Sequence, residues 1–421
     1  MTAPPRPDTH GRPTERKAAM LFIAITVLLD MVAIGIIFPV LPHLVGQMTG
    51  SGSEQTFWFG VLAFTFGVAN FFGAPVLGAL SDRFGRRPVL LLGIGGLALG
   101  FLVTGLATAL WLLVAVRLFS GGMQANAAVA NAYVADITPA EERARRFGLL
   151  GAMFGIGFTL GPVLGGLLGA IDVRLPFFAA AGLAALNWAY GWFVLPESLP
   201  LERRRAVDWR RANPLSSWSG LSRLAGVGPL VAVIALSALA QFTLHVTWVL
   251  YTHFKFGWGP AEVGWSLFAV GLMAILVQGV LLKHLLKRFA PQGIVVSGLL
   301  GGGLMYLGLG LAPNGAAVFA VIVLGNLLTA GTAATLSSLI STAASARQQG
   351  EAMGAVASVQ SLMGVLAPVI GTSLLGLVSA RPQGDAMLGL PLYFSALLQV
   401  AALVLAIRYF RRRPALAAAS A

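Results

Sequence analysis

Long apolar runs separated by short polar segments dominate the hydrophobic pattern of this chain. A helix of roughly 20 apolar residues crosses about 30 Å of hydrocarbon, because an α-helix rises about 1.5 Å per residue. The pattern predicts twelve membrane-spanning helices, near residues 18–42, 57–80, 88–109, 111–134, 147–170, 175–195, 227–252, 262–282, 293–312, 316–341, 352–378 and 389–408.

The composition supports a membrane protein and removes several kinds of chemistry. Hydrophobic residues make up 57% of the 421 residues and charged residues only 10%, whereas a soluble domain carries about 25% charged residues. The chain has no cysteine, which excludes disulfides, thiolate catalysis and iron–sulfur sites. It also lacks a metal-spaced His/Glu cluster, a nucleophile motif and a phosphate-binding loop, so we expect neither an enzyme nor a cofactor, metal or direct use of ATP.

The distribution of Lys and Arg predicts how the chain is oriented. With the N-terminus inside, 24 of the 28 basic residues fall on the cytoplasmic side, three (Arg174, Lys255 and Arg381) fall outside, and Arg117 lies within a span. This bias predicts that both termini are cytoplasmic. The first 17 residues lack a signal-peptide pattern and are expected to be a cytoplasmic tail. The net charge of +13 therefore reflects topology, and nucleic acid is not an expected partner.

The two halves of the chain repeat each other. Leu80–Phe84 matches Leu285–Phe289 at an offset of 205, and Pro162 matches Pro368 at an offset of 206. This repeat predicts an all-α integral membrane protein of twelve transmembrane helices in two pseudo-symmetric six-helix bundles, with a substrate site near the midplane between them. The expected segments are a tail (1–17), a first bundle (18–195), a cytoplasmic linker (196–226), a second bundle (227–408) and a tail (409–421).

Two charged residues inside predicted spans are the main candidates for proton coupling. Asp30 lies about twelve residues into the first span and is the only acidic residue deep in one. An ionised Asp there costs at least about 2.5–3.5 kcal/mol on insertion scales, which favours a function in proton or cation binding over a permanent structural hydrogen bond. Arg117 begins a polar stripe on the fourth span that continues through Gln124 and Asn131. We expect Arg117 to respond to the charge of Asp30, directly or through water; the alternative is an Arg that only fixes helix packing.

Other spans carry candidate substrate contacts and a packing motif. Glycines recur every fourth residue from Gly157 to Gly169 in the fifth span, a spacing that lets two helix backbones approach closely. Polar and aromatic side chains in several spans suit a flat amphiphilic molecule, although each is as readily explained by an interhelical hydrogen bond. These candidates are Asn70, Gln124, Asn131, Gln241, His245, Trp248, Gln278, Asn326 and Gln360.

The loop between the second and third spans is predicted to act as a gate. It contains Asp82 within a basic segment, and Asp136 at the end of the fourth span is a possible partner for one of its arginines. A loop that serves topology alone would explain the arginines but not Asp82. The candidate gating residues are Gly78, Asp82, Arg83, Gly85, Arg86, Arg87 and Asp136.

Together these motifs resemble a known family. The Gly78–Arg87 loop, Arg117 with Gly121-Gly122, and the set Gly157, Gly161, Pro162, Gly165 and Gly166 are similar to signatures of the major facilitator superfamily and its antiporters. Leu29-Asp30 and Asp136-Ile137-Thr138 narrow the resemblance to the tetracycline/H+ antiporter branch, from about residue 20 to Pro214. Met123–Asn126 stands where such exporters usually carry small residues.

The resemblance implies a function and a gating partner. It implies a drug exporter of the bacterial inner membrane, driven by a proton gradient without a cofactor. Twelve helices suffice for one pathway per chain, so we expect a monomer. It also implies that Asp82 meets the start of the eleventh helix, near Gly350, when the cytoplasmic side closes. We therefore expect proton-coupled export of a hydrophobic, aromatic compound. The alternative is a proton-coupled transporter, importer or exporter, of an endogenous small metabolite.

Overall fold

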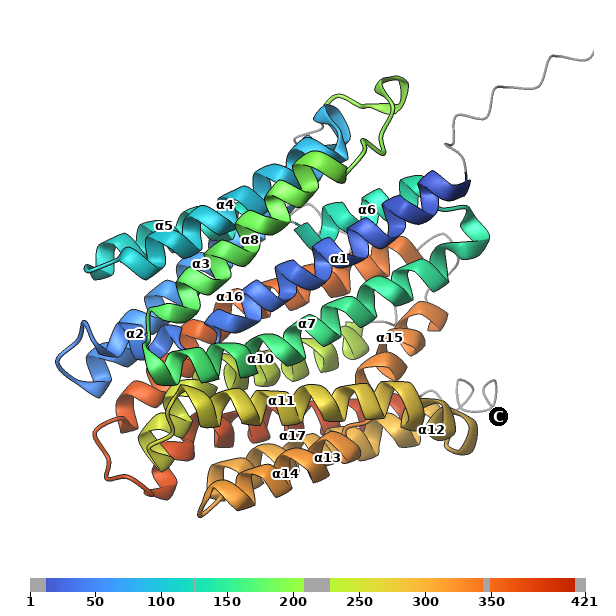
Figure 1. Cartoon of the computed structure of the whole chain (residues 1–421). Coiled ribbons are helices and arrows are strands. Elements are labelled where there is room, and N and C mark those ends of the chain that lie inside the picture. The colour runs from blue at the N-terminus through green and yellow to red at the C-terminus, as the bar shows by residue number, and fades with distance from the viewer. Residues whose placement is uncertain (1–12, 125, 208–227, 344–348, 413–421) are drawn as a thin grey trace, which may run out of the picture.

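The computed structural model describes residues 13–124, 126–207, 228–343 and 349–412. Over this part of the chain, twelve helical segments are long and apolar enough to cross a membrane, which confirms the predicted number. Figure 1 shows them running side by side, with the first six helices and the last six gathered in separate groups. The predicted all-helical, two-bundle fold is therefore confirmed.

The first bundle begins with a helix that starts earlier than predicted, at Pro13 rather than residue 18. Its helices are α1 (Pro13–Ile37), α2 (Leu41–Gly46), α3 (Gly52–Phe84), α4 (Arg86–Leu106), α5 (Leu110–Met123), α6 (Asn126–Ile137), η1 (Ala140–Glu142), α7 (Arg143–Ile171) and α8 (Leu175–Val194). A short turn, η2 (Leu201–Arg203), follows in the predicted linker, whose residues 208–226 lie outside the described residues.

The second bundle ends with a helix that continues four residues beyond the predicted end of its span, to Arg412. Its elements are α10 (Gly228–Phe256), α11 (Pro260–Leu276), the π-helical turn η4 (Val277–Leu281), α12 (Leu282–Arg288), α13 (Pro291–Leu311), α14 (Gly315–Leu328), α15 (Thr332–Ala343), α16 (Gln349–Val378), η5 (Ala386–Gly389) and α17 (Leu390–Arg412). The outer parts of both predicted tails, residues 1–12 and 413–421, lie outside the described residues.

The fourth span is broken rather than continuous. Helix α5 ends at Met123, the ψ of 71° at the following Gln124 leaves the helical region, and α6 begins at Asn126. The tenth span breaks likewise, between Leu328 and Thr332, where Gly331 has a φ of +79°. Gln124 and Thr329, the residues that directly follow α5 and α14, are separated by the same offset of 205 as the sequence repeat. In transporters, helices interrupted at corresponding positions of the two halves commonly flank the binding site.

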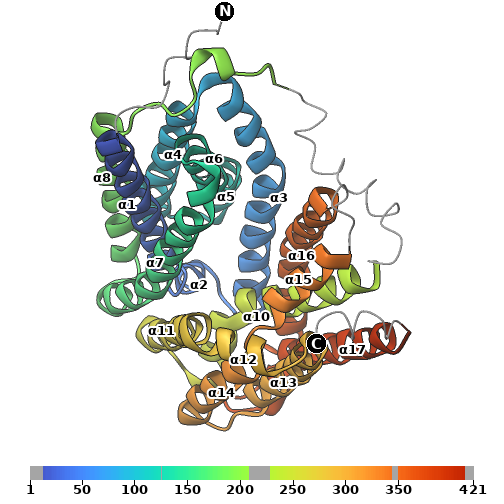
Figure 2. The same cartoon turned by 90° about the vertical axis from the view of Figure 1, so that its right-hand side faces the viewer.

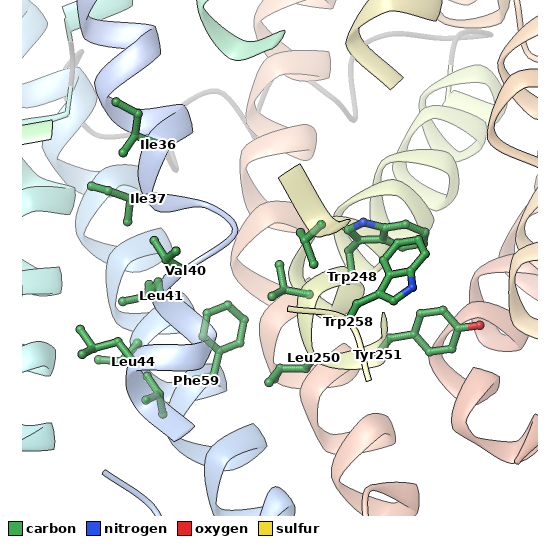
Figure 3. Close-up of a cluster of buried hydrophobic side chains, with 14 of the residues drawn as sticks. Ile36, Ile37, Val40, Leu41, Leu44, Phe59, Trp248, Leu250, Tyr251 and Trp258 are labelled. Atoms are coloured by element: carbon green, nitrogen blue, oxygen red, sulfur yellow. The ribbon is translucent and has the colours of Figure 1, made fainter. Parts of the chain in front are cut away.

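The two bundles touch at one end of the molecule. We call the end that holds the α3–α4 loop the basic end and the opposite end the far end. A single hydrophobic cluster joins the bundles at the far end, with Ile36, Val40 and Phe59 from the first and Trp248 and Trp258 from the second (Figure 3). Toward the basic end each bundle has its own cluster: one around Tyr133, the other around Leu299.

Glycines on the helices that face the other bundle show the same asymmetry. A Cβ at Gly67 of α3 would lie 3.5 Å from the carbonyl oxygen of Gly364 in α16. A Cβ at Gly166 of α7 would lie 2.5 Å from the carbonyl oxygen of Pro260 in α11. Toward the basic end of α3, α7 and α16, and in the turn η4 that follows α11, a Cβ would meet no atom within 4 Å at Gly78, Gly148, Gly151, Gly155, Gly279 or Gly354. The two bundles are therefore in contact at the far end and apart at the basic end. Figure 2 views the molecule from the basic end.

Candidate functional site

Asp30 is buried in the middle of the first span and pairs with the fourth span. The residue is only 3% exposed. The amide nitrogen of Asn126 donates to both of its carboxylate oxygens, each at 3.2 Å. Asn126 is the first residue of α6, so the break in the fourth span brings a helix N-terminus to the carboxylate. The N-terminus of a helix favours negative charge. Sequence reasoning missed this pairing, and the unusual Asn126 was the only signal for it.

A small cavity adjoins the Asp30 carboxylate. It measures about 10 Å³ and is lined by Thr26, Val27, Asp30, Met31, Leu90, Asn126, Ala127 and Ala130. Asp30 is the only ionisable residue in this lining. The carboxyl group thus lies in an otherwise apolar pocket between α1 and α6, with an amide rather than a cation as its hydrogen-bond partner.

Arg117 packs beside an aromatic ring of α3. Its guanidinium carbon is 5.7 Å from the ring centroid of Phe66, and its Nε makes no hydrogen bond in the described chain. Among the described residues, no hydrogen bond or ion pair joins Arg117 to Asp30. A coupling between them stays a prediction, and in this state it has no direct contact to act through.

The α3–α4 loop is held by a network within the first bundle. Arg86 contacts Asp82 at 2.6 Å and Asp136 at 3.0 Å, so it is the arginine of the loop that meets the end of the fourth span. Arg87 instead donates to the carbonyl oxygen of Trp192 at 2.5 Å, and Arg83 packs over Phe84. The predicted contact of Asp82 with the start of the eleventh helix belongs to a state in which the basic end is closed. It stays a prediction.

The beginning of the linker takes part in the same network. Glu197 accepts from the backbone N–H of Arg86 at 2.8 Å, and Arg205 donates its own N–H to the carbonyl oxygen of Asp82 at 3.1 Å. Gly85, with a φ of +106°, leaves room for the Glu197 carboxylate. Sequence analysis treated Glu197 as plain linker, because a pairing across 111 residues leaves no local pattern.

The glycines of the fifth span pack directly on the first span. A Cβ at Gly161 would lie 2.7 Å from the Cα of Gly35, and one at Gly157 would lie 2.9 Å from the carbonyl oxygen of Leu28. Gly165 meets the backbone of Ile36 in the same way. On the other side of α7, the carbonyl oxygen of Pro162 and the Cα of Gly166 approach Gly264 of α11. Helix α7 therefore links the first span to the second bundle through backbone contacts.

The candidate substrate contacts fall into different environments. Trp248 is buried in the far-end cluster and donates from Nε1 to the Ser266 hydroxyl at 3.0 Å, so in this state it packs rather than faces a substrate. Asn326 donates to the Ile322 carbonyl oxygen of its own helix. Asn70, Gln124 and His245 are partly buried, whereas exposed side chains are found at Asn131, Gln241, Gln278 and Gln360.

The far end is closed by a contact between two histidines. The rings of His43 on α2 and His253 on α10 lie 5.1 Å apart, edge to face. Each Nδ1 is hydrogen-bonded to a backbone carbonyl oxygen, that of Pro39 for His43 and that of Trp258 for His253. Sequence analysis did not single out either histidine, because nothing along the chain relates them.

Two six-helix bundles that meet at one end of the molecule and stand apart at the other have the arrangement of a membrane transporter. The family model described as Major Facilitator Superfamily matches residues 23–368 and 230–421. The chain is 37% identical to the class C tetracycline resistance protein of Escherichia coli, covering 90% of this chain and 95% of that protein. It is 34% identical to the class D tetracycline resistance protein of Salmonella ordonez, covering 96% and 99%.

Solved structures agree with these relatives. The crystal structure of the human organic anion transporter MFSD10 matches with a TM-score of 0.67 and 25% identity, over 94% of this chain and all of that chain. This protein belongs to the major facilitator superfamily, and it is similar over nearly its whole length to tetracycline resistance proteins.

Proposed function

We propose that this transporter is a proton-coupled antiporter that exports a hydrophobic, aromatic compound of the tetracycline type from a bacterial cell. The observation that carries the proposal is the Asp30 site: a buried carboxyl group in the first span whose partner is the neutral Asn126. A carboxylate without a fixed cation can exist in both protonation states, which is what loading and releasing a proton requires. The similarity to tetracycline resistance proteins supports the substrate class.

The proposed orientation places the basic end in the cytoplasm of the inner membrane, with both chain termini there and residues 196–226 linking two domains. In this orientation the structure corresponds to a cytoplasm-facing state. The α3–α4 loop would then be a latch that docks on the second bundle when the basic end closes. A single chain holds the whole pathway, so we propose a monomer that uses no cofactor. A proton gradient suffices as the energy source, since moving one charge through 100 mV supplies about 2.3 kcal/mol.

A second candidate is export or import of organic anions. Its support is the similarity to the human organic anion transporter MFSD10. It keeps the proposed transport pathway but changes the substrate. Both candidates are separated by testing tetracycline beside an aromatic carboxylate such as benzoate.

The test is substrate uptake into proteoliposomes under an imposed pH gradient. Wild type is compared with Asp30→Asn and with Asp172→Asn, a control in which the exposed aspartate after α7 loses its charge. We expect Asp30→Asn to lose gradient-driven tetracycline uptake and to keep tetracycline exchange, while the control behaves as wild type. Full gradient-driven uptake by Asp30→Asn would refute the coupling site. Uptake of benzoate instead of tetracycline would favour the second candidate.

A further inference from the structure

We propose that Phe147, Phe154 and Phe158 of α7 form an aromatic stripe that binds the planar aromatic part of the substrate, with Phe38 closing the inner end of the site. This inference rests on the proposed export of an aromatic compound and names the side chains that recognise it. Sequence analysis assigned no substrate contact to these four residues, because an apolar side chain in a membrane span carries no local sign of what it faces.

The stripe continues toward the far end as a line of residues on one side of α7. Residues three or four apart are neighbours on a helix surface, and seven residues make about two turns. Phe147, Phe154, Phe158, Pro162 and Gly169 follow one another at spacings of 7, 4, 4 and 7. They therefore share one side of the helix.

The far-end members of this line show where that side points. Helix α7 packs between α1 and α11 (Figure 1). A Cβ on Gly35 of α1 would lie 3.0 Å from Cδ of Pro162, and a Cβ on Gly264 of α11 would lie 2.6 Å from the Pro162 carbonyl oxygen. A Cβ on Gly169 would lie 3.0 Å from the Cβ of Pro260 in α11. The line therefore faces the space between the two bundles, which is filled at the far end.

Toward the basic end the same side of α7 is uncovered. Phe147 is 37% exposed, Phe154 44% and Phe158 37%. The side that faces lipid differs, because its exposed large side chains are all aliphatic: Leu149, Leu160, Leu164, Leu167 and Ile171. Exposed aromatic rings that face the opening between the bundles suit a ligand site, since such sites are lined mainly by hydrophobic and aromatic side chains.

The rings at the inner end have the geometry to hold a further ring. Phe154 and Phe158 are nearly parallel, with an interplanar angle of 12° and centroids 6.4 Å apart. Phe38, in the turn after α1, meets Phe158 edge to face at 6.3 Å. Aromatic rings prefer offset-stacked or edge-to-face contacts. A planar ligand that lies on Phe154 and Phe158 would meet Phe38 as the end of the site.

The rings lie at the depth of the proposed proton site. Gly157, between Phe154 and Phe158 in sequence, packs on the part of α1 that contains Asp30. A Cβ on Gly157 would lie 2.7 Å from the Cβ of Met31. A substrate on the stripe would thus be separated from the Asp30 level by the α1–α7 contact alone. This arrangement lets the two sites influence each other without sharing a side chain.

The direction of the stripe is tested by cysteine labelling of the protein in lipid nanodiscs, since the chain has no native cysteine. We expect Phe154→Cys and Phe158→Cys to react with a membrane-impermeant methanethiosulfonate reagent and saturating tetracycline to slow both reactions. Leu164→Cys, on the lipid side of the same helix, is the matched control and should react far more slowly.

Substrate recognition is tested by the concentration dependence of tetracycline uptake. We expect Phe158→Leu to raise KM about twofold to tenfold, the equivalent of one lost aromatic contact, and to keep the dependence on the pH gradient. Phe158→Tyr keeps the ring and should restore the wild-type KM. Phe178→Leu is the matched control, because Phe178 of α8 is equally exposed, at 38%, and packs beside Gly105 of α4.

Two outcomes would overturn the aromatic site. Labelling of Phe154→Cys and Phe158→Cys no faster than that of Leu164→Cys would show that the stripe faces lipid. Labelling without protection by tetracycline or benzoate, together with a wild-type KM in Phe158→Leu, would reduce the rings to packing in the state closed at the basic end. Protection by benzoate in a protein that transports no tetracycline would keep the aromatic site and refute the proposed substrate.

Discussion

His43 and His253 belong to different bundles, yet their rings pack edge to face with centroids 5.1 Å apart. Close by, a Cβ on Gly60 of α3 would lie 3.1 Å from the Cβ of Thr372 in α16. Both contacts join the bundles at the far end, where the shared hydrophobic cluster lies. Transport by alternating access requires these contacts to separate. A covalent cross-link at this end should therefore hold the protein in one conformation.

A disulfide between Gly60→Cys and Thr372→Cys should lock the far end. The separation of the two Cβ positions is slightly shorter than the usual distance of about 3.5–4.5 Å in a disulfide, so a small shift suffices. The chain has no native cysteine, so the pair can be introduced directly. We expect oxidation to abolish transport and dithiothreitol to restore it, measured as tetracycline uptake with a gel-shift assay for the bond. Gly78→Cys with Gly354→Cys is the control, because neither position meets an atom within 4 Å here. Unchanged transport in the oxidised Gly60/Thr372 variant would mean that the far end does not open.

Gly165→Ala should destabilise the packing of α7 on α1. The added methyl group would lie 2.6 Å from the carbonyl carbon of Ile36, and backbone cannot move aside as a side chain can. Overpacking of this kind costs about 1–3 kcal/mol. Gly155→Ala on the same helix is the matched control, since its methyl group meets nothing within 4 Å. Thermal unfolding in detergent, followed by size-exclusion chromatography, measures the difference. Equal melting temperatures would contradict the backbone contact.

Arg86→Met should destabilise the first bundle more than Arg83→Ala. Arg86 is buried and holds both Asp82 and Asp136, so its loss leaves Asp136 with the Ser198 hydroxyl alone. We expect a loss of about 1–3 kcal/mol, below the full value for a buried pair because Asp82 is half exposed. Arg83 is exposed and packs only on Phe84 in the contacts described. Melting temperatures of the two variants decide the point, and a larger loss for Arg83→Ala would refute the network.

Asn126→Leu should impair proton coupling more than folding. The leucine has a similar volume but cannot donate to Asp30, which leaves the carboxylate without its amide partner. We expect gradient-driven tetracycline uptake to fall about tenfold, as for the loss of one hydrogen bond to a charged group. Asn126→Ser keeps a donor and should retain more activity. If both variants transport like wild type, the amide has no part in the coupling.

The sequence was sufficient for the number of spans and the helical fold because apolar run length is a local property of the chain. The breaks at Gln124 and Thr329 were not predicted, although they are separated by the same offset of 205 as Leu80–Phe84 and Leu285–Phe289. What the sequence missed depends on distant partners. Asn126 meets Asp30 across 96 residues, and Glu197 meets Arg86 across 111. Such pairs depend on how helices are placed, which no single periodic pattern records.

Several glycines at the basic end have no neighbouring atoms next to their Cα atoms, which indicates that they pack in a second conformation. Gly78, Gly148, Gly279 and Gly354 have free space above their Cα atoms, whereas their counterparts at the far end fit against the opposite bundle. Small residues that touch nothing in one conformation are suited to close contact in another. The sequence of this interface therefore allows the bundles to pack closely at either end in turn. A bulky residue at any of these four glycines would hinder packing at the basic end and bias the protein toward the conformation that is open there.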